Sequence, residues 1–307
     1  MRRRRFLALA AAAAGASAVG LHGALRPEVS AWRGRALGAD AEIRLRGPAR
    51  LAEPALAAAR AEIARAEALF SLHRPDSALS RLNRDGVLRA PPAAFLAVLD
   101  LAGEVHAATG GLFDPSVQTL WALEARGEAA GPALARALAA VGWGRVRAEA
   151  AAVRLAPGMA LTLNGIAQGW AADRVAEALA AHGFPDALVD AGELRAGRGA
   201  WRVGVAAPDG ALLETRSLTR SALATSSPGA LRFADGRAHI LHPAVPELAP
   251  LWATVSVEAE TAALADAVST ALVFLTEAEA RRLPARLPGL RRLLLATAEG
   301  EVRTVEA

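Results

Sequence analysis

The sequence predicts an α+β fold with mixed, largely antiparallel sheets flanked by helices. Stretches with helical periodicity alternate with short strand-like runs, and some of those runs follow one another with no helix between them. Neighbouring runs of this kind are typical of antiparallel hairpins, whereas a purely parallel sheet needs a crossover at every connection. With 307 residues, 53% of them hydrophobic, the chain can build a sizeable core.

Turn residues and helix breakers set the boundaries of the predicted elements. Pro75 ends the first long helix, and Gly110-Gly111 closes the second. Pro132 opens the third, and Gly183 ends the fourth. The expected helices cover 50–70, 92–108, a stretch from Pro132, 166–182, 262–275 and a short C-terminal segment; the expected strands cover 30–48, 153–163, 186–191, 201–206, 212–218, 237–242, 252–259 and a hairpin-like pair near 291–305.

Composition excludes several classes of function. Every basic residue is Arg, so no lysine Schiff base can form, and the absence of Cys excludes thiol nucleophiles, zinc thiolate sites and disulfides. The formal net charge is +4, but residues 1–18 carry four Arg and no acidic residue, so the remainder is formally neutral. A neutral chain with 4% aromatic residues offers neither a basic surface nor stacking platforms, and we expect no nucleic-acid partner.

The first eighteen residues have the pattern of a twin-arginine-like signal peptide. Four Arg precede a short apolar run, residues 3–7 read Arg-Arg-Arg-Phe-Leu, and residues 16–18 offer the small-residue pattern that signal peptidase reads. An uncleaved anchor is the alternative, although the run of about 12 apolar residues is shorter than the roughly 20 that span a membrane. We therefore expect a protein exported to the periplasmic or extracytoplasmic side, with no stable membrane span after cleavage, and one domain over 19–307.

The segment 109–115, TGGLFDP, places two glycines and an Asp-Pro turn between helical stretches. Glycines let a ligand approach the backbone closely. Asp114 could contact such a ligand, or it could be an ordinary turn residue or helix cap, which is the more common role.

The segment 161–173, LTLNGIAQGWAAD, runs from an expected strand through Asn164-Gly165 into a helix whose first turn contains small residues. Junctions of this kind expose N–H groups that suit an anion such as a pyrophosphate. A short and tightly packed turn explains the pattern equally well.

The segment 225–243 holds a Thr-Ser-Ser cluster and two histidines, His239 and His242, on an expected strand. We expect both rings on the same face of that strand. They could be metal ligands, a proton-transfer pair or part of an exposed edge.

The segment 264–272, LADAVSTAL, sets Asp266 and Thr270 four residues apart in an otherwise apolar helix, so the carboxylate and the hydroxyl share one face. A buried Asp must be paired or bound to a metal, and oxygen ligands of this type suit Mg²⁺. The other interpretation is an Asp in the first turn that faces the helix dipole.

Five segments, in this order, resemble the FAD:protein FMN transferases, the ApbE-type flavin transferases. Each segment is weak alone, whereas five in the right order and spacing over nearly the whole mature chain are not expected by chance. They are FSLHRPDSALSRLN at 70–83, TGGLFDP at 109–115, LNGIAQGWAADRVAEAL at 163–179, TSS with HILHP within 225–243, and ADAVSTAL at 265–272.

The resemblance implies an ApbE-like architecture and a site for FAD, which is the substrate. The pyrophosphate would lie near residues 165–168. Mg²⁺ would be held by the Gly165 carbonyl, Asp266 and Thr270. The residues implied to contact FAD are Leu112, Phe113, Asp114, Thr162, Gln168, Thr225, Ser226 and Ile240.

The implied reaction attaches FMN to a protein. A Thr or Ser hydroxyl of an acceptor flavoprotein attacks the phosphorus on the FMN side, AMP leaves, and the acceptor keeps FMN through a phosphoester bond. Such a reaction needs charge neutralisation on the pyrophosphate and a group that takes the hydroxyl proton. Mg²⁺ would supply the first, and His239, which matches the histidine of the family's HI-x-x-P motif, is the candidate for the second.

The chain departs from the family pattern close to the nucleotide. The family usually has Asp at the position of Thr162, Lys at Gln168 and Asp at His242, and it differs again at residues 245–246 and in the turn 191–193. Loss of a Lys beside a pyrophosphate removes a charge-assisted contact of roughly 1.5–3 kcal/mol, so we expect weaker FAD binding or slower transfer. The alternatives are an FAD pyrophosphatase and a non-catalytic FAD-binding protein of the same fold.

We predict that export removes residues 1–18, because the charged start, the short apolar run and the small-residue site occur together. N-terminal sequencing of the exported protein should begin after Ala18. An intact Met1 in a membrane fraction would show that the segment is an anchor instead.

Overall fold

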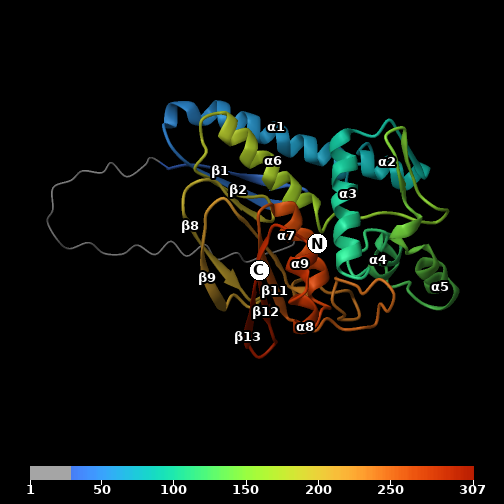
Figure 1. Ribbon diagram of the computed structural model, residues 1–307. Coiled ribbons are helices and arrows are strands. Elements are labelled where there is room, and N and C mark those ends of the chain that lie inside the picture. The colour runs from blue at the N-terminus through green and yellow to red at the C-terminus, as the bar shows by residue number, and fades with distance from the viewer. Residues whose placement is uncertain (1–28) are drawn as a thin grey trace, which may run out of the picture.

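An eight-stranded antiparallel sheet forms the centre of the protein (Figure 1). The computed structural model describes residues 29–307, so the predicted signal peptide lies outside the described residues. In spatial order the strands are β1 (Val29–Ala36), β2 (Ala39–Arg46), β6 (Ala187–Asp190), β7 (Leu194–Ala196), β10 (Ala222–Ser226), β11 (Thr254–Ala259), β12 (Leu290–Ala296) and β13 (Val302–Glu306). The predicted fold class is confirmed.

Two smaller antiparallel sheets accompany the central one. The first consists of β3 (Val87–Arg89), β5 (Ala152–Arg154) and β4 (Arg147–Ala148), and the second is the hairpin of β8 (Trp201–Ala206) and β9 (Leu212–Leu218). The helices are α1 (Ala52–Phe70), α2 (Ala78–Asp85), α3 (Ala93–Ala108), α4 (Gln118–Ala125), α5 (Gly131–Ala140), α6 (Ala167–Ala181), α7 (Ala262–Leu272), α8 (Glu277–Ala280) and α9 (Leu283–Arg286). None of the helices within residues 29–307 combines the length and the apolar character that a membrane crossing requires.

The core is divided among layers on the two faces of the central sheet. Helices α1 and α6 lie side by side over β1, β2 and β6, where Ile63 and Val175 pack against Ile43 (Figure 1). The β8–β9 hairpin covers the other face and buries Trp201 and Val203 against neighbours from the sheet. Helix α7 packs in the largest cluster, together with α3 and strands β11 and β12.

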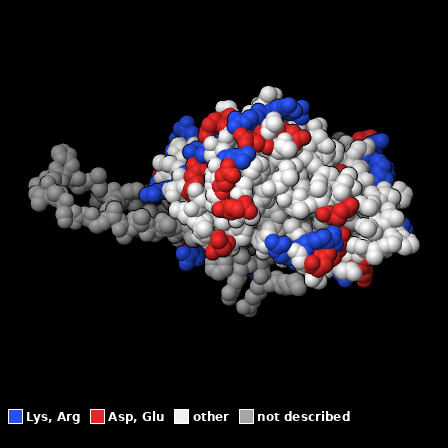
Figure 2. Space-filling model, turned by 90° about the horizontal axis from the view of Figure 1, so that it is seen from below, with Lys and Arg blue, Asp and Glu red and all other residues white. Residues whose placement is uncertain are grey.

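Charged side chains of both signs are mixed on the molecular surface. On the face shown in Figure 2, Arg residues alternate with Asp and Glu, and no broad basic area is visible. Positive and negative charges therefore lie close together on this face.

Three predicted strands are wrong. The single strand expected at 30–48 is two antiparallel strands, β1 and β2, because the chain turns back at residues 37–38, which both have positive φ angles. The expected strand at 153–163 stops at Arg154, because Pro157 and Gly158 form a turn in which the N–H of Met159 donates to the carbonyl of Ala156 at 3.1 Å. The expected strand at 237–242 has no ladder partner and contains only an isolated bridge between residues 232 and 238. Short elements such as α4, β7 and β10 were not predicted, because each is too short to show a periodicity.

Helices α6 and α7 cross at a glycine. A Cβ atom added to Gly169 would lie 2.1 Å from the carbonyl oxygen of Ala262, so no side chain fits between the two backbones. Asp173, one turn further along α6, accepts hydrogen bonds from the N–H groups of Ala262 and Ala263 at 2.9 and 3.0 Å and so caps α7. Burial raises the pKa of the Asp173 carboxyl, while these two donors act in the opposite direction.

We predict that Gly169→Ala lowers the free energy of unfolding by roughly 1–3 kcal/mol, because its methyl group would overlap the Ala262 carbonyl and force the helices apart. Urea denaturation measures the change. Gly144→Ala is the control, since a Cβ there has no heavy atom within 4 Å, and it should change stability by less than about 0.5 kcal/mol. Equal effects in the two variants would contradict the crossing described here.

Candidate active site

One cavity of about 350 Å³ brings together all twelve residues that the sequence singled out. They come from segments far apart in the chain: the 109–115 loop, the 161–168 junction, β10, the loop after it, and α7. The twelve are Leu112, Phe113, Asp114, Thr162, Gly165, Gln168, Thr225, Ser226, His239, Ile240, Asp266 and Thr270.

Three oxygen-bearing groups converge where α7 meets the start of α6. The Asp266 side chain is buried, with the residue only 4% exposed, and its Oδ2 accepts a hydrogen bond from the N–H of Gly169 at 3.1 Å. Asp266 therefore faces the first turn of α6 and not that of its own helix. Thr270 lies one turn further on, and a Cβ added to Gly165 would be 2.6 Å from its Oγ1, so the Gly165 backbone lies directly against that hydroxyl.

These groups fit a hard divalent cation. A carboxylate, a hydroxyl and a backbone carbonyl are the oxygen ligands that Mg²⁺ prefers, and Mg²⁺ usually completes its shell with water and substrate phosphates. Among the described residues there is no group of three or more His, Cys, Asp and Glu side chains placed to hold a metal. An ion at Gly165, Asp266 and Thr270 would therefore depend on ligands from substrate and solvent.

Asn83 holds the junction segment that leads into α6. Its Nδ2 donates to the carbonyl of Leu161 and its Oδ1 accepts from the N–H of the same residue, both at 2.8 Å. The next N–H, of Thr162, donates to the carbonyl of Pro115 at 2.8 Å. These bonds replace a strand ladder and explain why an irregular segment keeps a defined path. The motif at 70–83 thus contributes support, a role that the sequence alone did not reveal.

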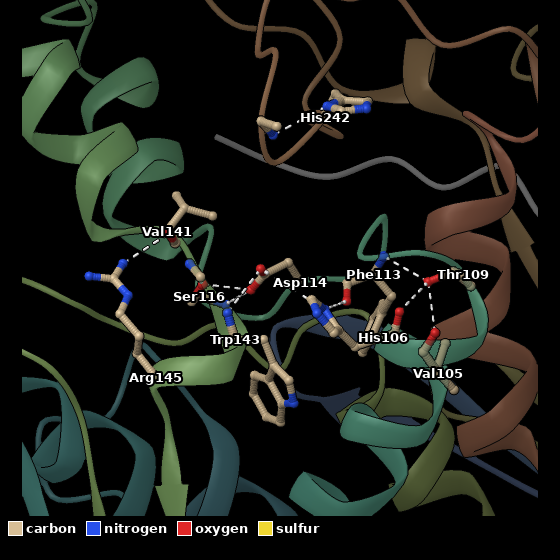
Figure 3. Close-up of polar contacts among 12 residues, drawn as sticks. Val105, His106, Thr109, Phe113, Asp114, Ser116, Val141, Trp143, Arg145 and His242 are labelled. Atoms are coloured by element: carbon tan, nitrogen blue, oxygen red, sulfur yellow. Dashed lines mark hydrogen bonds and ion pairs between the residues drawn. The ribbon is translucent and has the colours of Figure 1, made fainter.

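Asp114 is a turn residue in the structure. Its Oδ1 accepts from the N–H and the Oγ of Ser116 at 2.8 and 2.5 Å, and its Oδ2 accepts from the N–H of Trp143 at 3.2 Å (Figure 3). The preceding Gly110 and Gly111 have φ angles of 64° and 89°, which only glycine adopts easily. Asp114 is therefore an ordinary turn residue, which was the more common of its two interpretations, and it also borders the cavity.

His239 borders the cavity with one ring nitrogen held by backbone. Its Nδ1 lies 3.0 Å from the carbonyl oxygen of Leu231 and 3.2 Å from that of Pro228. A carbonyl oxygen only accepts, so in the neutral ring Nδ1 must carry the proton. Nε2 is then the basic nitrogen, which is the state that a general base requires.

His242 does not join His239, and the expectation that both rings share one face is wrong. The ring of His242 packs edge-on against Phe274, and its Nδ1 accepts from the N–H groups of Ala244 and Val245 at 3.2 and 3.1 Å. Figure 3 shows it on a separate loop, away from the Asp114 network. Burial lowers the pKa of His242 and favours the neutral ring that these two donors need. The two histidines are three positions apart, so even a regular strand would point their side chains to opposite faces. A proline after His242 and a turn before His239 also interrupt the strand itself.

The cavity is acidic. Its charged side chains are Asp114, Glu193 and Asp266, and within residues 29–307 no Arg side chain lines it. Gln168, which stands where the family usually has Lys, is buried against Gly192, whose added Cβ would lie 2.6 Å from its amide carbon. The described side chains that line the cavity therefore offer an anionic ligand no permanent positive charge.

Hydroxyl pairs connect β10 to its neighbours behind the cavity wall. Ser256 and Ser269 donate their protons to backbone carbonyls, so Thr225 and Ser226 are the donors in their pairs, whereas either oxygen can donate in the third pair. The Thr-Ser-Ser cluster is the only part of this arrangement that the sequence signalled. The pairs are Thr225 with Ser256 at 3.0 Å, Ser226 with Ser269 at 2.9 Å, and Ser227 with Thr254 at 3.0 Å.

Comparisons with known proteins point in one direction. The model of the ApbE family matches residues 37–294. The ApbE protein of Thermotoga maritima is 26% identical, with a TM-score of 0.78 over 91% of this chain and 97% of that one. The apo flavinyl transferase ApbE of Pseudomonas stutzeri is 24% identical, with a TM-score of 0.77 over 93% and 96%. The flavin transferase ApbE of Vibrio cholerae is 20% identical, with a TM-score of 0.76 over 92% and 97%. The comparison with curated proteins gave no match.

Proposed function

Since this chain belongs to the ApbE family, we propose that it transfers FMN from FAD to a Thr or Ser hydroxyl of an acceptor flavoprotein, with AMP as the second product. The observation that carries the proposal is the single cavity that gathers all twelve implied site residues from distant segments. Names of similar solved structures, which include flavin transferases, support the same class of reaction.

The chemical step is a substitution at phosphorus. The acceptor Oγ forms a bond to the phosphorus of the FMN half, and the bond from that phosphorus to the bridging oxygen breaks. AMP leaves with that oxygen, and the hydroxyl proton passes to Nε2 of His239. The carbonyls of Pro228 and Leu231 support this role, because they fix the proton on Nδ1 and stabilise the charged ring that forms.

Gly165, Asp266 and Thr270 are the residues that would hold Mg²⁺ beside the pyrophosphate. When bound, the ion supplies positive charge that screens the phosphates from the attacking oxygen. The N–H groups at the start of α6 are already engaged, those of Ile166 and Ala167 with the carbonyl of Leu163 and that of Gly169 with Asp266. Because the cavity lining holds three carboxylates and, among residues 29–307, no Arg, FAD binding itself should depend on the divalent cation.

An extracytoplasmic setting is part of the proposal. The signal-like residues 1–18 support export, and a twin-arginine route would carry the enzyme across already folded. Its acceptor would then be a flavoprotein with a Thr or Ser exposed on that side of the inner membrane.

We predict that residues 19–307 with FAD, Mg²⁺ and an acceptor flavoprotein yield AMP and protein-bound FMN in equal amounts. His239→Ala should slow transfer about 100-fold, because it removes the base.

Asp266→Ala and Thr270→Ala should each weaken Mg²⁺ binding in calorimetric titrations with FAD present. AMP and free FMN without acceptor would indicate a pyrophosphatase instead, and FAD binding without any AMP would indicate a binding protein.

We predict that Thr162→Asp combined with Gln168→Lys raises the transfer rate, because the pair restores an acid and a base beside the nucleotide. The added Lys should also tighten FAD binding in the absence of Mg²⁺, since it supplies a charge-assisted contact of roughly 1.5–3 kcal/mol. Gln118→Lys is the charge-matched control at another position of the cavity wall and should have a smaller effect. If the double variant transfers FMN no faster than the wild type, and if Gln118→Lys binds FAD equally tightly, Gln168 does not lie beside the pyrophosphate.

A further inference from the structure

His239 lies on a segment, residues 231–243, that contains no helix and no strand in the described structure. Its internal order comes from an isolated bridge and from a turn in which the N–H of Phe233 donates to the carbonyl of Arg237 at 2.9 Å. No sheet ladder therefore sets the place of the histidine ring. The contacts of this segment with the rest of the protein must set it instead.

A buried carboxylate on α4 makes the strongest of these contacts. Glu124 is only 4% exposed, and its two oxygens accept from the two terminal nitrogens of Arg237, with 3.1 Å between Nη1 and Oε1. Paired hydrogen bonds of this type fix the orientation as well as the distance of the partners. The bonds to Glu124 raise the pKa of Arg237, so the guanidinium stays charged. Asp235, on the same turn, binds the guanidinium Nε at 2.6 Å.

A second contact comes from the preceding turn of α4. The Nε1 of Trp121 donates to the carbonyl oxygen of His239 at 3.0 Å, and its ring packs edge-on against Phe233 at 5.8 Å. Residues 121 and 124 lie on the same side of the helix and hold the segment at two points. Trp121 borders the cavity and can itself touch a ligand, whereas Glu124 and Arg237 do not border it.

We propose that Glu124 is a positioning residue for flavin transfer and acts through Arg237. Their pair fixes the 231–243 segment so that the His239 ring keeps its Nδ1 bonds to the carbonyls of Pro228 and Leu231, which leaves Nε2 as the proton acceptor. The role of Glu124 in catalysis rests on the proposed function. The structural part of the proposal concerns only the position and tautomer of the His239 ring.

The first test is the kinetics of Glu124→Gln, which keeps the shape of the side chain and removes its charge. We expect kcat for transfer to fall about tenfold and KM for FAD to stay unchanged, because a displaced base affects the chemical step and not the binding of FAD. Arg237→Lys keeps the positive charge but can contact Glu124 at only one point, so its kcat should fall less than that of Glu124→Gln.

Glu258→Gln is the matched control. Glu258 is also a buried carboxylate paired with a partly exposed Arg, since its Oε2 lies 2.9 Å from Nη2 of Arg216, but this pair joins β11 to β9 and does not border the cavity. The control should lose stability to a similar extent and keep its kcat. An equal loss of kcat in the control would mean that the effect of Glu124→Gln is general destabilisation, and the proposal would fall.

The second readout is the tautomer of His239, followed by ¹⁵N NMR with the His239→Gln variant for assignment. We expect one Nδ1–H tautomer in the wild type and in Glu258→Gln, and a mixture in Glu124→Gln. If the wild-type protein transfers no flavin, the proposed function is wrong. The tautomer of His239 would then be the only test of the structural part of the proposal. Unchanged tautomer and unchanged kcat in Glu124→Gln overturn the proposal. If that variant does not fold, Arg237→Lys is judged by the same two readouts.

Discussion

Helices α6 and α7 meet with the Gly169 backbone against the carbonyl of Ala262, a contact that no residue with a side chain permits. The same crossing lets Asp173 cap α7 and lets Asp266 accept from the N–H of Gly169. The close approach of the two backbones therefore brings the Asp266 carboxylate to the start of α6, beside the glycines of the junction. Both Asp266 and Gly165 border the cavity at this crossing.

The two sides of the cavity are stabilised in different ways. Around Asp266 the backbone is in regular helices, and the geometry follows from packing. Around His239 the backbone is irregular, and side chains on α4 hold it. In the proposed reaction, a site of this construction would separate charge neutralisation near Asp266 from proton transfer at His239.

Local sequence signals predicted the parts of the fold that depend on local interactions. The long helices and the strands of the β8–β9 and β12–β13 hairpins were predicted because Gly and Pro punctuate them and because their periodicity is clear. The five weak segments indicated twelve residues that all border one cavity, though Asp114 proved to be held within its own turn. The strand through His239 and His242 was predicted incorrectly, because a turn and a proline interrupt it. This segment contacts α4 through the Glu124–Arg237 pair, whose members lie 113 positions apart. Such a pairing leaves no periodic trace in the sequence.

The hydroxyl pairs at β10 give the cavity wall a defined polarity. Ser269 gives its single hydroxyl proton to the carbonyl oxygen of Asp266 at 3.0 Å, so the hydroxyl of Ser226 is the donor in the 2.9 Å bond between the two serines. The Ser226 oxygen therefore offers only lone pairs to the cavity that it borders. At this point the wall can accept a hydrogen bond from a ligand, but it cannot donate one without breaking a bond that the fold already makes.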